Sequence, residues 1–348
     1  MAKDLIRKYS TFILKNNRIV LFLYNSYFKI KNKNKYLKLS EERSALNIYE
    51  YEQLAKPLPF YPQESVKDTN YYGHAFALKK YASISYLPQF SVIEHGLYLG
   101  SYVPDYFRYK TIKNIITFSD NRCQHIVDKG INKNVIVVGP YIYYANSLLN
   151  EKELAEEKQK LGKVLLVFVA HSTNKENVSF DSNSFLNKID AVAKEYDTVL
   201  ICLYYLDILN GTYSNVFVGN KYRIVTAGHV YDYNFISRLK TIILLSDFTM
   251  SNSLGTHIGY CITLGKPHYY FCQEKQYYSS SGKQLSMVRQ EDKDVLNKEK
   301  KELMDAFSEE SSIITEKQLY CVNKYWGASS VKSPEELHDI LEKSICKK

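Results

Sequence analysis

The strongest constraint in this sequence is a continuous apolar run that ends at a histidine. Residues 163–172 read KVLLVFVAHS. A run without alternating polar residues predicts a strand that is buried on both faces, as in a parallel sheet covered by helices. Residues 182–196 follow with apolar side chains at helical spacing, and 198–208 form a second apolar run. This alternation predicts an α/β fold with a parallel sheet.

The strand–helix alternation occurs twice along the chain. In the first half, residues 90–96, 114–120 and 134–140 are predicted strands, separated by segments that are compatible with helices. The second half has predicted strands at residues 163–172, 198–208, 222–228, 248–253 and 266–271. We therefore predict two Rossmann-like parallel-sheet domains, at residues 46–150 and 160–330, that face each other across a cleft.

The end of the chain is charged, and we predict that it is helical from residue 275 onward. Residues 331–348 form the predicted C-terminal helix. Its start has the residue order of a capping box, with Ser333 as N-cap, Pro334 at the first helical position and Glu336 two residues later.

Positive charge is concentrated in residues 1–45, which contain eleven Lys or Arg and three acidic residues, against a formal net charge of +9 for the chain. The longest uncharged run there, 19–28, is about half the length that a transmembrane helix needs. The segment predicts a basic amphipathic element on the anionic inner face of the cell membrane. A basic helix docked on the protein body is the alternative. Because the rest of the chain is near neutral, no nucleic-acid partner is predicted.

The cysteines and histidines give further expectations about compartment and metal. Six cysteines are scattered without a C-x-x-C pair, and no secretory signal is visible. This predicts a cytoplasmic protein, peripheral on the inner membrane face. Short histidine spacings typical of zinc sites do not occur, so no metal ion is predicted.

A predicted strand enters a predicted helix at residues 251–257, which read SNSLGTH. Free N–H groups at a helix start attract anions, and the helix dipole adds to this attraction. Serine hydroxyls can donate to phosphate oxygens, and glycine permits close approach of the backbone. We predict a phosphate site here, and a well-capped helix is the alternative. The predicted ligands are Ser251, Asn252, Ser253, Gly255, Thr256 and His257.

Three histidines terminate predicted strands: His95, His171 and His229. The carboxyl ends of parallel strands share one edge of a sheet, so these side chains are expected to converge on the cleft. Ser172 follows His171 and joins the predicted donor site. His95, or Glu94 beside it, is the candidate general base, because imidazole titrates near neutral pH and a desolvated carboxylate can be tuned toward it.

Three stretches together resemble bacterial capsule and surface-polysaccharide synthesis proteins, which look like glycosyltransferases of the GT-B architecture. These are YYGHAFALKKY (71–81), IEHGLYLG (93–100) and the segment from Val225 to Phe271. The likeness covers roughly residues 70–275. It implies that the second domain binds a nucleotide-sugar donor, that the first binds the acceptor and that no bound metal is needed.

The resemblance also implies roles for single residues. Ser251, Ser253, Gly255 and Thr256 would hold the donor phosphates, and His95 or Glu94 would be the base. The Glu-x7-Glu pair of retaining members does not occur near residues 247–271, and neither does the acidic-Gly with His-Pro pairing of bacterial sialyltransferases. The donor and the stereochemical outcome therefore remain open.

The predicted function is metal-independent transfer of a sugar from a nucleotide-sugar to a hydroxyl of a growing capsule or lipopolysaccharide-type glycan, free or lipid-linked. His229 and His257 would stabilise the leaving phosphate. No cofactor besides the nucleotide-sugar substrate is expected. The alternatives are a CDP-polyol phosphotransferase of the teichoic-acid type, a nucleotide-sugar 2-epimerase and a non-catalytic assembly partner.

Overall fold

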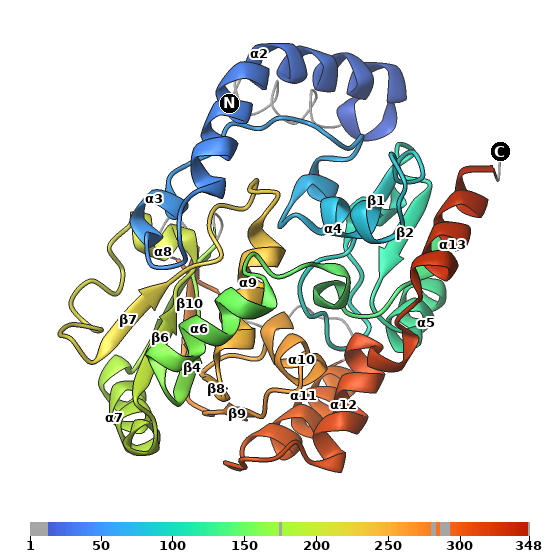
Figure 1. The fold of residues 1–348 in the computed structure, drawn as a ribbon. Coiled ribbons are helices and arrows are strands. Elements are labelled where there is room, and N and C mark those ends of the chain that lie inside the picture. Colours follow the sequence, from blue (N-terminus) through green and yellow to red (C-terminus); the bar gives the residue numbers. More distant parts are fainter. Residues whose placement is uncertain (1–12, 174–175, 280–282, 286–292, 347–348) are drawn as a thin grey trace.

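The computed structural model describes residues 13–173, 176–279, 283–285 and 293–346. Figure 1 shows two lobes, each built on a parallel sheet. The sheet of the first lobe has the strand order β1-β2-β3. Its strands are β1 (Ser91–Ile93), β2 (Asn114–Thr117) and β3 (Asn134–Val137). The helices α4 (His74–Tyr81) and α5 (Asp120–Asp128) belong to this lobe.

The sheet of the second lobe has five parallel strands in the order β7-β6-β4-β8-β9. They are β7 (Tyr222–Val225), β6 (Thr198–Cys202), β4 (Val164–Phe168), β8 (Phe248–Ser251) and β9 (His268–Tyr270). The chain builds outward from β4 on one side and then returns to its other side with β8. The gap between the ends of β4 and β8 is therefore the topological switch point, where open α/β sheets bind ligands.

Both faces of this sheet are buried, which explains the unbroken apolar run in β4. Leu165 and Val167 belong to a hydrophobic cluster with helix α7 (Ser182–Val192). Leu166 faces the opposite way, into the cluster that contains residues of α9 (Phe235–Leu245) and α10 (Thr256–Thr263). Successive side chains of a strand point to opposite faces of the sheet, so a strand that is buried on both faces needs apolar residues at every position. The predicted α/β class with two parallel-sheet lobes is confirmed.

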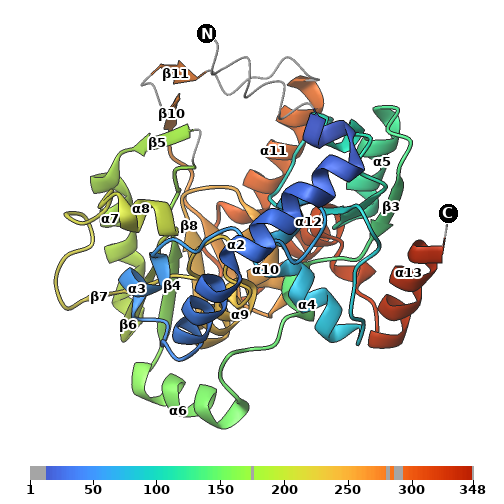
Figure 2. The ribbon, with the colours of Figure 1, turned by 90° about the horizontal axis from the view of Figure 1, so that it is seen from above.

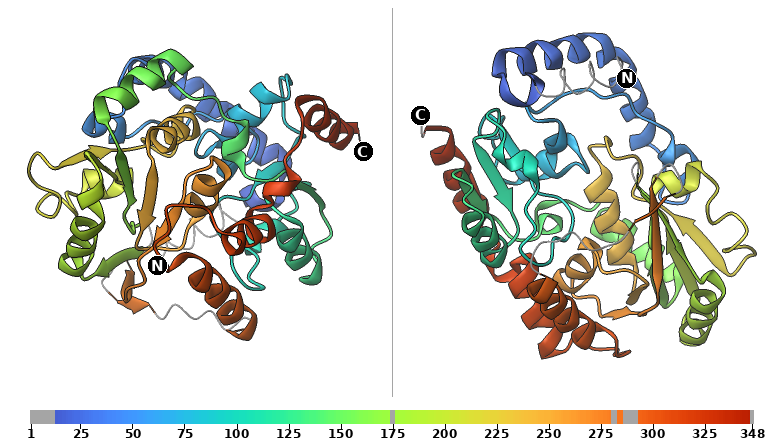
Figure 3. Two further views of the ribbon diagram at one scale, coloured as in Figure 1. Left: turned by 60° about the horizontal axis from the view of Figure 1, so that its bottom comes forward. Right: turned by 180° about the vertical axis from the view of Figure 1, so that it is seen from behind.

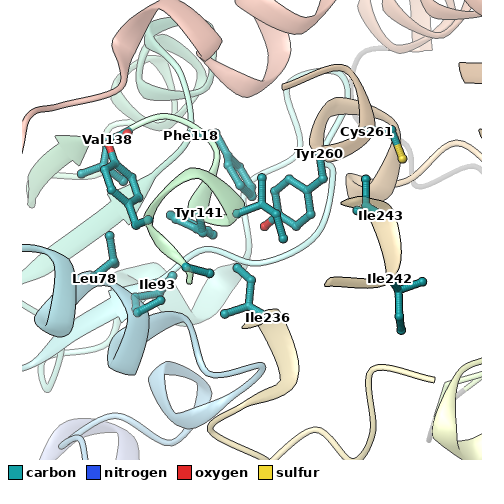
Figure 4. Close-up of a cluster of buried hydrophobic side chains, with 14 of the residues drawn as sticks. Leu78, Ile93, Phe118, Val138, Tyr141, Ile236, Ile242, Ile243, Tyr260 and Cys261 are labelled. Atoms are coloured by element: carbon teal, nitrogen blue, oxygen red, sulfur yellow. Dashed lines mark hydrogen bonds between the residues drawn. The ribbon is translucent and has the colours of Figure 1, made fainter. Parts of the chain in front are cut away.

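One hydrophobic core continues from the first lobe into the second (Figure 4). Ile93, Phe118 and Tyr141 of the first lobe share this cluster with Ile236 and Tyr260 of the second. The lobes are therefore packed against each other on one side, rather than joined only by a linker.

Helix α2 (Arg18–Ser44) lies across both lobes (Figures 1 and 2). Near its start, the Arg18 side chain donates to the carbonyl of Lys110 in the first lobe, at 3.0 Å. Further along, the Tyr36 hydroxyl donates to the carbonyl of Tyr231, also at 3.0 Å, on the segment that leads into α9. In the described part of the chain, no helix is both long and apolar enough to cross a bilayer. Residues 1–12 of the predicted basic segment lie outside the described residues.

The C-terminal helices return the chain to the first lobe (Figure 3). They are α11 (Lys293–Phe307), α12 (Glu316–Trp326) and α13 (Pro334–Cys346). Asn134 of β3 donates to the Ser344 hydroxyl at 3.3 Å, and the His338 ring pairs with the carbonyl of Ala82 at 2.9 Å. The predicted capping box is confirmed, because Ser333 and Glu336 bond each other's backbone N–H groups.

The prediction of a helical tail from residue 275 is wrong for its first part. Strands β10 (Lys275–Ser279) and β11 (Gln284–Leu285) form a small antiparallel sheet with β5 (Glu176–Phe180). Tyr277 lies opposite Val178 in this sheet. Aromatic and β-branched residues favour such cross-strand pairs, so tertiary pairing outweighed the polar composition. Further helices are α3 (Tyr51–Ala55), α6 (Glu151–Leu161) and α8 (Tyr205–Leu209).

Candidate functional site

A cavity of about 390 Å³ lies between the two lobes, at the carboxyl edge of the five-stranded sheet. The second lobe contributes residues that follow β4, β6 and β7, together with the loop between β8 and α10. The first lobe contributes Tyr72, His74 and His95. The volume is in the range of small-molecule sites, about 300–1,000 Å³. The cavity also occupies the switch point of the sheet, where a ligand is expected.

The N-terminus of α10 forms one wall of this cavity. Gly255 is its N-cap, with an extended φ of −162°, and no side chain caps the helix. Ser253, Gly255, Thr256 and His257 all line the cavity. The first turn of any helix leaves backbone N–H groups without intrahelical acceptors, and these carry the positive end of the dipole. Four of the six predicted phosphate ligands thus lie in a wall whose chemistry suits an anion.

His257 is held in this wall as a neutral imidazole. Its ring stacks on Phe168 at the end of β4, with centroids 4.7 Å apart and planes 23° apart. Burial, and to a smaller extent the nearby His171, lower the pKa of His257 to about 3. Its Nε2 atom and the Tyr260 hydroxyl are buried without a partner in the described chain. An unpaired buried polar atom costs about 1–3 kcal/mol, so a ligand that pairs with these atoms removes that cost.

His95 reaches the same cavity from the first lobe. Its ring packs against the rings of Tyr71 and Tyr72, with centroid distances of 5.3 and 5.4 Å. Burial lowers the pKa of His95, and the Asp68 carboxylate nearby acts in the opposite direction. The Nδ1 atom has no partner in the described chain. A neutral imidazole with an uncommitted nitrogen is the form that a general base requires.

Glu94 lies away from the cavity, in the interior of the first lobe. It is fully buried, and its carboxylate accepts hydrogen bonds from the Arg122 guanidinium at 2.7–2.9 Å and from the Thr117 hydroxyl at 2.6 Å. Neighbouring residues of an extended segment point in opposite directions, so His95 and Glu94 cannot both face the cleft. The structure thus brings only His95 to the site, and it assigns Glu94 to a buried ion pair.

Ser251 and Asn252 lie beneath the cavity wall and do not line it. Both are fully buried. The Ser251 hydroxyl donates to the carbonyl of Ser253 and pairs with Nε2 of His268, each at 3.0 Å. Asn252 accepts from the N–H of Ala170 at 2.7 Å, which ties the end of β8 to the end of β4. These two predicted phosphate ligands therefore hold the loop in shape, and their polar atoms are already used.

Ser172 and His229 also lie outside the cavity lining. The N–H of Ser172 donates to the Asp207 carboxylate at 3.3 Å. His229 accepts from the N–H of Tyr231 through Nδ1 at 3.2 Å, and burial followed by the charge of Arg43 lowers its pKa to about 4. Both residues follow strand ends as predicted, but each is committed to backbone and side-chain contacts beside the site.

His171 lines the cavity, as predicted, at its exposed rim. Its ring packs on Tyr204 with centroids 4.4 Å apart. The Tyr204 hydroxyl lies 3.3 Å from the hydroxyl of Tyr72, so this contact crosses from one lobe to the other. Neither tyrosine could be picked out from the sequence, because tyrosine is so frequent in this chain that a single one gives no signal.

Tyr72 has a further unusual feature, a φ of +59° in a non-glycine residue. This conformation costs energy and persists only where surrounding contacts enforce it. Its N–H donates to the carbonyl of Val230 at 2.8 Å, and its carbonyl accepts from the N–H of Ile236 at 3.2 Å. The neighbouring His74 also lines the cavity, and burial lowers its pKa to about 3. The first lobe therefore presents neutral aromatic and imidazole rings to the site.

Among the residues that the structure describes, no three of His, Cys, Asp and Glu gather closely enough to hold a metal ion.

No protein-family model matches this chain, and neither does any curated protein sequence. Solved structures do match in fold. A UDP-GlcNAc 2-epimerase from Neisseria meningitidis, bound to UDP-GlcNAc, is 12% identical with a TM-score of 0.33, over 67% of this chain and 60% of that chain. S. aureus MnaA in complex with UDP is 10% identical with a TM-score of 0.40, over 78% of each chain. The wall teichoic acid polymerase TagF is 14% identical with a TM-score of 0.36, over 68% of this chain and 59% of that chain.

This chain thus spans about 60% of the length of the epimerase and of the polymerase. All three likenesses concern the fold, and their TM-scores are too low to support an inference about activity. The case for function depends on the geometry of the cavity.

Proposed function

We propose that this protein is a glycosyltransferase that uses a nucleotide-sugar donor and a sugar hydroxyl as acceptor. The observation that carries the proposal is that the uncapped N-terminus of α10 and the uncommitted His95 line one cavity from opposite lobes. A helix N-terminus suits the donor phosphates, and a neutral imidazole across the cavity suits the removal of the acceptor proton.

The proposed reaction assigns each group one task. The donor phosphates lie against the N–H groups of Thr256 and His257, and His257 donates a further hydrogen bond. The acceptor hydroxyl attacks the anomeric carbon while His95 takes its proton. The bond from that carbon to the phosphate oxygen breaks, and the nucleotide phosphate leaves with the electron pair. The helix dipole stabilises the negative charge that develops on the leaving group.

The electrostatics of the cavity fit this assignment. In the described part of the chain, the cavity lining contains neither Lys nor Arg. Burial keeps His74 and His257 neutral, because it lowers the pKa of each to about 3. Uncharged donors and a helix dipole in an apolar, partly enclosed site act in a low dielectric, where each is stronger than in water.

A thermal-shift panel of UDP-, GDP-, CMP- and CDP-linked donors tests the proposal. A ligand that binds only the folded protein stabilises it by about 2.7 kcal/mol at a hundredfold excess over Kd. One nucleotide class is expected to raise the melting temperature. Failure of every donor to do so would contradict the proposal and would favour the non-catalytic assembly partner.

A Gly255→Ala variant locates the donor phosphates. The backbone there is extended, so alanine is tolerated, but its Cβ would lie 2.9 Å from the His257 ring. The ring must move, and the donor-induced shift is expected to fall while the ligand-free melting temperature is retained. An unchanged donor shift would place the phosphates elsewhere.

Product analysis separates the alternatives. A glycosyltransferase releases a nucleotide only when a glycan acceptor, free or lipid-linked, is present. A 2-epimerase would change the sugar of the donor without an acceptor, and a polyol phosphotransferase would release CMP from a CDP-polyol. Equal turnover with and without EDTA is expected, because the proposal includes no metal ion or further cofactor. Capsule or lipopolysaccharide-type glycans are the proposed acceptors.

His95→Gln tests the base directly. Removal of a general base typically costs about 10²–10⁴ in kcat. Donor binding in the thermal-shift assay should persist, because His95 lies across the cavity from α10. His338→Gln on α13 is the matched control, since this half-exposed histidine lies outside the cavity. Full turnover of His95→Gln would remove His95 from the mechanism.

A further inference from the structure

The outer face of α2 carries an apolar stripe. Among the described residues, six of the fifteen most exposed large apolar side chains lie on this helix. They are Ile19, Phe22, Leu23, Tyr27, Ile30 and Leu37. Successive members are separated by one, three, four or seven residues, so they share one face of the helix. Ile30 is 82% exposed and Phe22 is 69% exposed, so nothing in the described chain covers this stripe.

The opposite face of α2 anchors the helix to the body. Asn25 donates to the carbonyl of Ser65 at 2.7 Å, and Asn32 donates to that of Phe60 at 2.7 Å. Tyr36 is buried and bonded to Tyr231. The helix is thus fixed by polar and aromatic contacts on its inner face, while the six residues of the stripe point to solvent. The outer face of an ordinary surface helix is polar, whereas the outer face of α2 carries this apolar stripe.

Lysines border the stripe. Exposed lysines lie along the middle and the C-terminal part of α2: Lys29, Lys31, Lys33, Lys35 and Lys38. No Asp or Glu occurs between residues 13 and 40. Glu41 and Glu42 follow, and the Glu42 carboxylate lies 4.0 Å from the Lys38 ammonium group. The surface formed by the stripe and these lysines is therefore apolar at its centre and positive at its margins.

We propose that this surface of α2 binds an anionic lipid bilayer, with the helix lying in the plane of the interface. Apolar side chains of such helices enter the boundary between head groups and acyl chains, and flanking Lys residues contact the anionic head groups. Each Lys near an anionic leaflet favours binding by about fivefold. The surface stands on its own geometry and does not require the proposed glycosyl transfer.

Charge argues against a second copy of this chain as the occupant. A symmetric pair would place the lysine-rich margins of two α2 helices in one interface without any acidic partner from residues 13–40. Like charges in an interface cost binding energy. An anionic bilayer supplies the complementary charge for these lysines.

A short series of contacts connects α2 to the cavity. Tyr36 bonds to Tyr231, the ring of Tyr231 lies 5.6 Å from that of Tyr71, and Tyr71 lies 5.3 Å from His95. A bilayer at the outer face of α2 would thus lie close to the proposed acceptor side of the site. This position suits an acceptor that is carried by a lipid.

Vesicle sedimentation of the full chain tests the proposal. The vesicles contain phosphatidylcholine with about one third phosphatidylglycerol, against phosphatidylcholine alone. Binding is expected only with the anionic lipid and should weaken at about 1 M salt, where the screening length is about 3 Å. A Phe22→Gln, Ile30→Gln double variant should bind at least about tenfold more weakly. A Lys29→Gln, Lys33→Gln double variant should bind the anionic vesicles about 25-fold more weakly.

The matched control is a Val218→Gln, Ile313→Gln double variant, which changes two comparably exposed apolar residues away from α2. It should bind vesicles as the unchanged chain does. The donor-induced thermal shift reports separately on folding and on the proposed function, and it should be the same in all variants. The proposal would be overturned if the control variant lost as much vesicle binding as the α2 variants, or if binding did not depend on lipid charge. It would also be overturned if the chain formed a dimer in solution that the Phe22 and Ile30 substitutions dissociated.

Discussion

Glu94 and His95 are adjacent in sequence and have separate roles in the structure. His95 lines the cavity and its Nδ1 atom is buried without a partner in the described chain, whereas Glu94 is fully buried against Arg122. Buried carboxylates are stable when paired, and removal of one partner leaves an uncompensated charge. The residue that resembles a catalytic acid in the sequence is thus an element of the first lobe's core.

Glu94→Gln is therefore expected to lower the free energy of unfolding by about 3 kcal/mol, because it leaves the Arg122 guanidinium buried without a counter-charge. Urea unfolding measures this loss. At a temperature where the variant is still folded, turnover should be within a few-fold of the unchanged chain. A variant that is as stable as the unchanged chain but inactive would instead indicate a catalytic role for Glu94.

Three buried histidines predict how stability depends on pH. Burial lowers the pKa of His74 and His257 to about 3 and that of His229 to about 4. In the unfolded chain the value is about 6.5, so between these values the unfolded chain binds more protons. The free energy of unfolding should fall as pH drops below 6.5, by up to about 2 kcal/mol per histidine at pH 5. Urea unfolding at pH 7.5 and 5 measures this, and equal stability at both would refute it.

At the scale of single elements, α10 shows how packing fixes the site. The structure shows that Gly259 packs against the fully buried Trp326 of α12. The position of the α10 N-terminus in the cavity therefore depends on a helix that lies about sixty residues further along the chain.

Gly259→Ala tests this contact. Alanine normally stabilises a helix relative to glycine by about 1 kcal/mol. Here its Cβ would lie 2.3 Å from the Trp326 ring, so overpacking should instead destabilise the protein by about 1–3 kcal/mol. Thermal unfolding measures the sign of the change. A second change, Trp326→Leu, should relieve part of the clash, and strictly additive losses would contradict this explanation.

At the scale of the whole molecule, the two lobes share one hydrophobic core. The hydrophobic cluster in Figure 4 passes from one lobe to the other. Helix α13 then covers the first lobe with Leu337 and Leu341, both fully buried in that cluster. The cavity is held between lobes that are tied together at more than one place, so its two walls are positioned before a ligand arrives.

Deletion of residues 331–348 should destabilise the first lobe. Leu337 and Leu341 each contribute about 1.5–3 kcal/mol through burial. Calorimetry of the truncated chain is expected to show a lower and less cooperative transition. The control ends the chain after Ser344, which retains both leucines. An unchanged transition in the longer deletion would show that α13 does not hold the first lobe.

Local patterns in the sequence determined the parallel strands, because a strand buried on both faces needs an unbroken apolar run such as that of β4. They also determined the capping box of α13, whose residues are neighbours. The rule that parallel strands share a carboxyl edge predicted that His95, His171 and His229 converge. His95 and His171 line the cavity, and His229 does not.

Tertiary structure alone decided which polar residues face the cavity. The Ser251 hydroxyl is hydrogen-bonded to His268 on the next strand, and Glu94 forms an ion pair with Arg122 on a helix. The pairing of β5 with β10 joins segments about a hundred residues apart. Such contacts depend on partners that are distant in sequence, so local composition carries no signal for them. The sequence thus determined where strands end, and the packed lobes decided which side chains at those ends remain available.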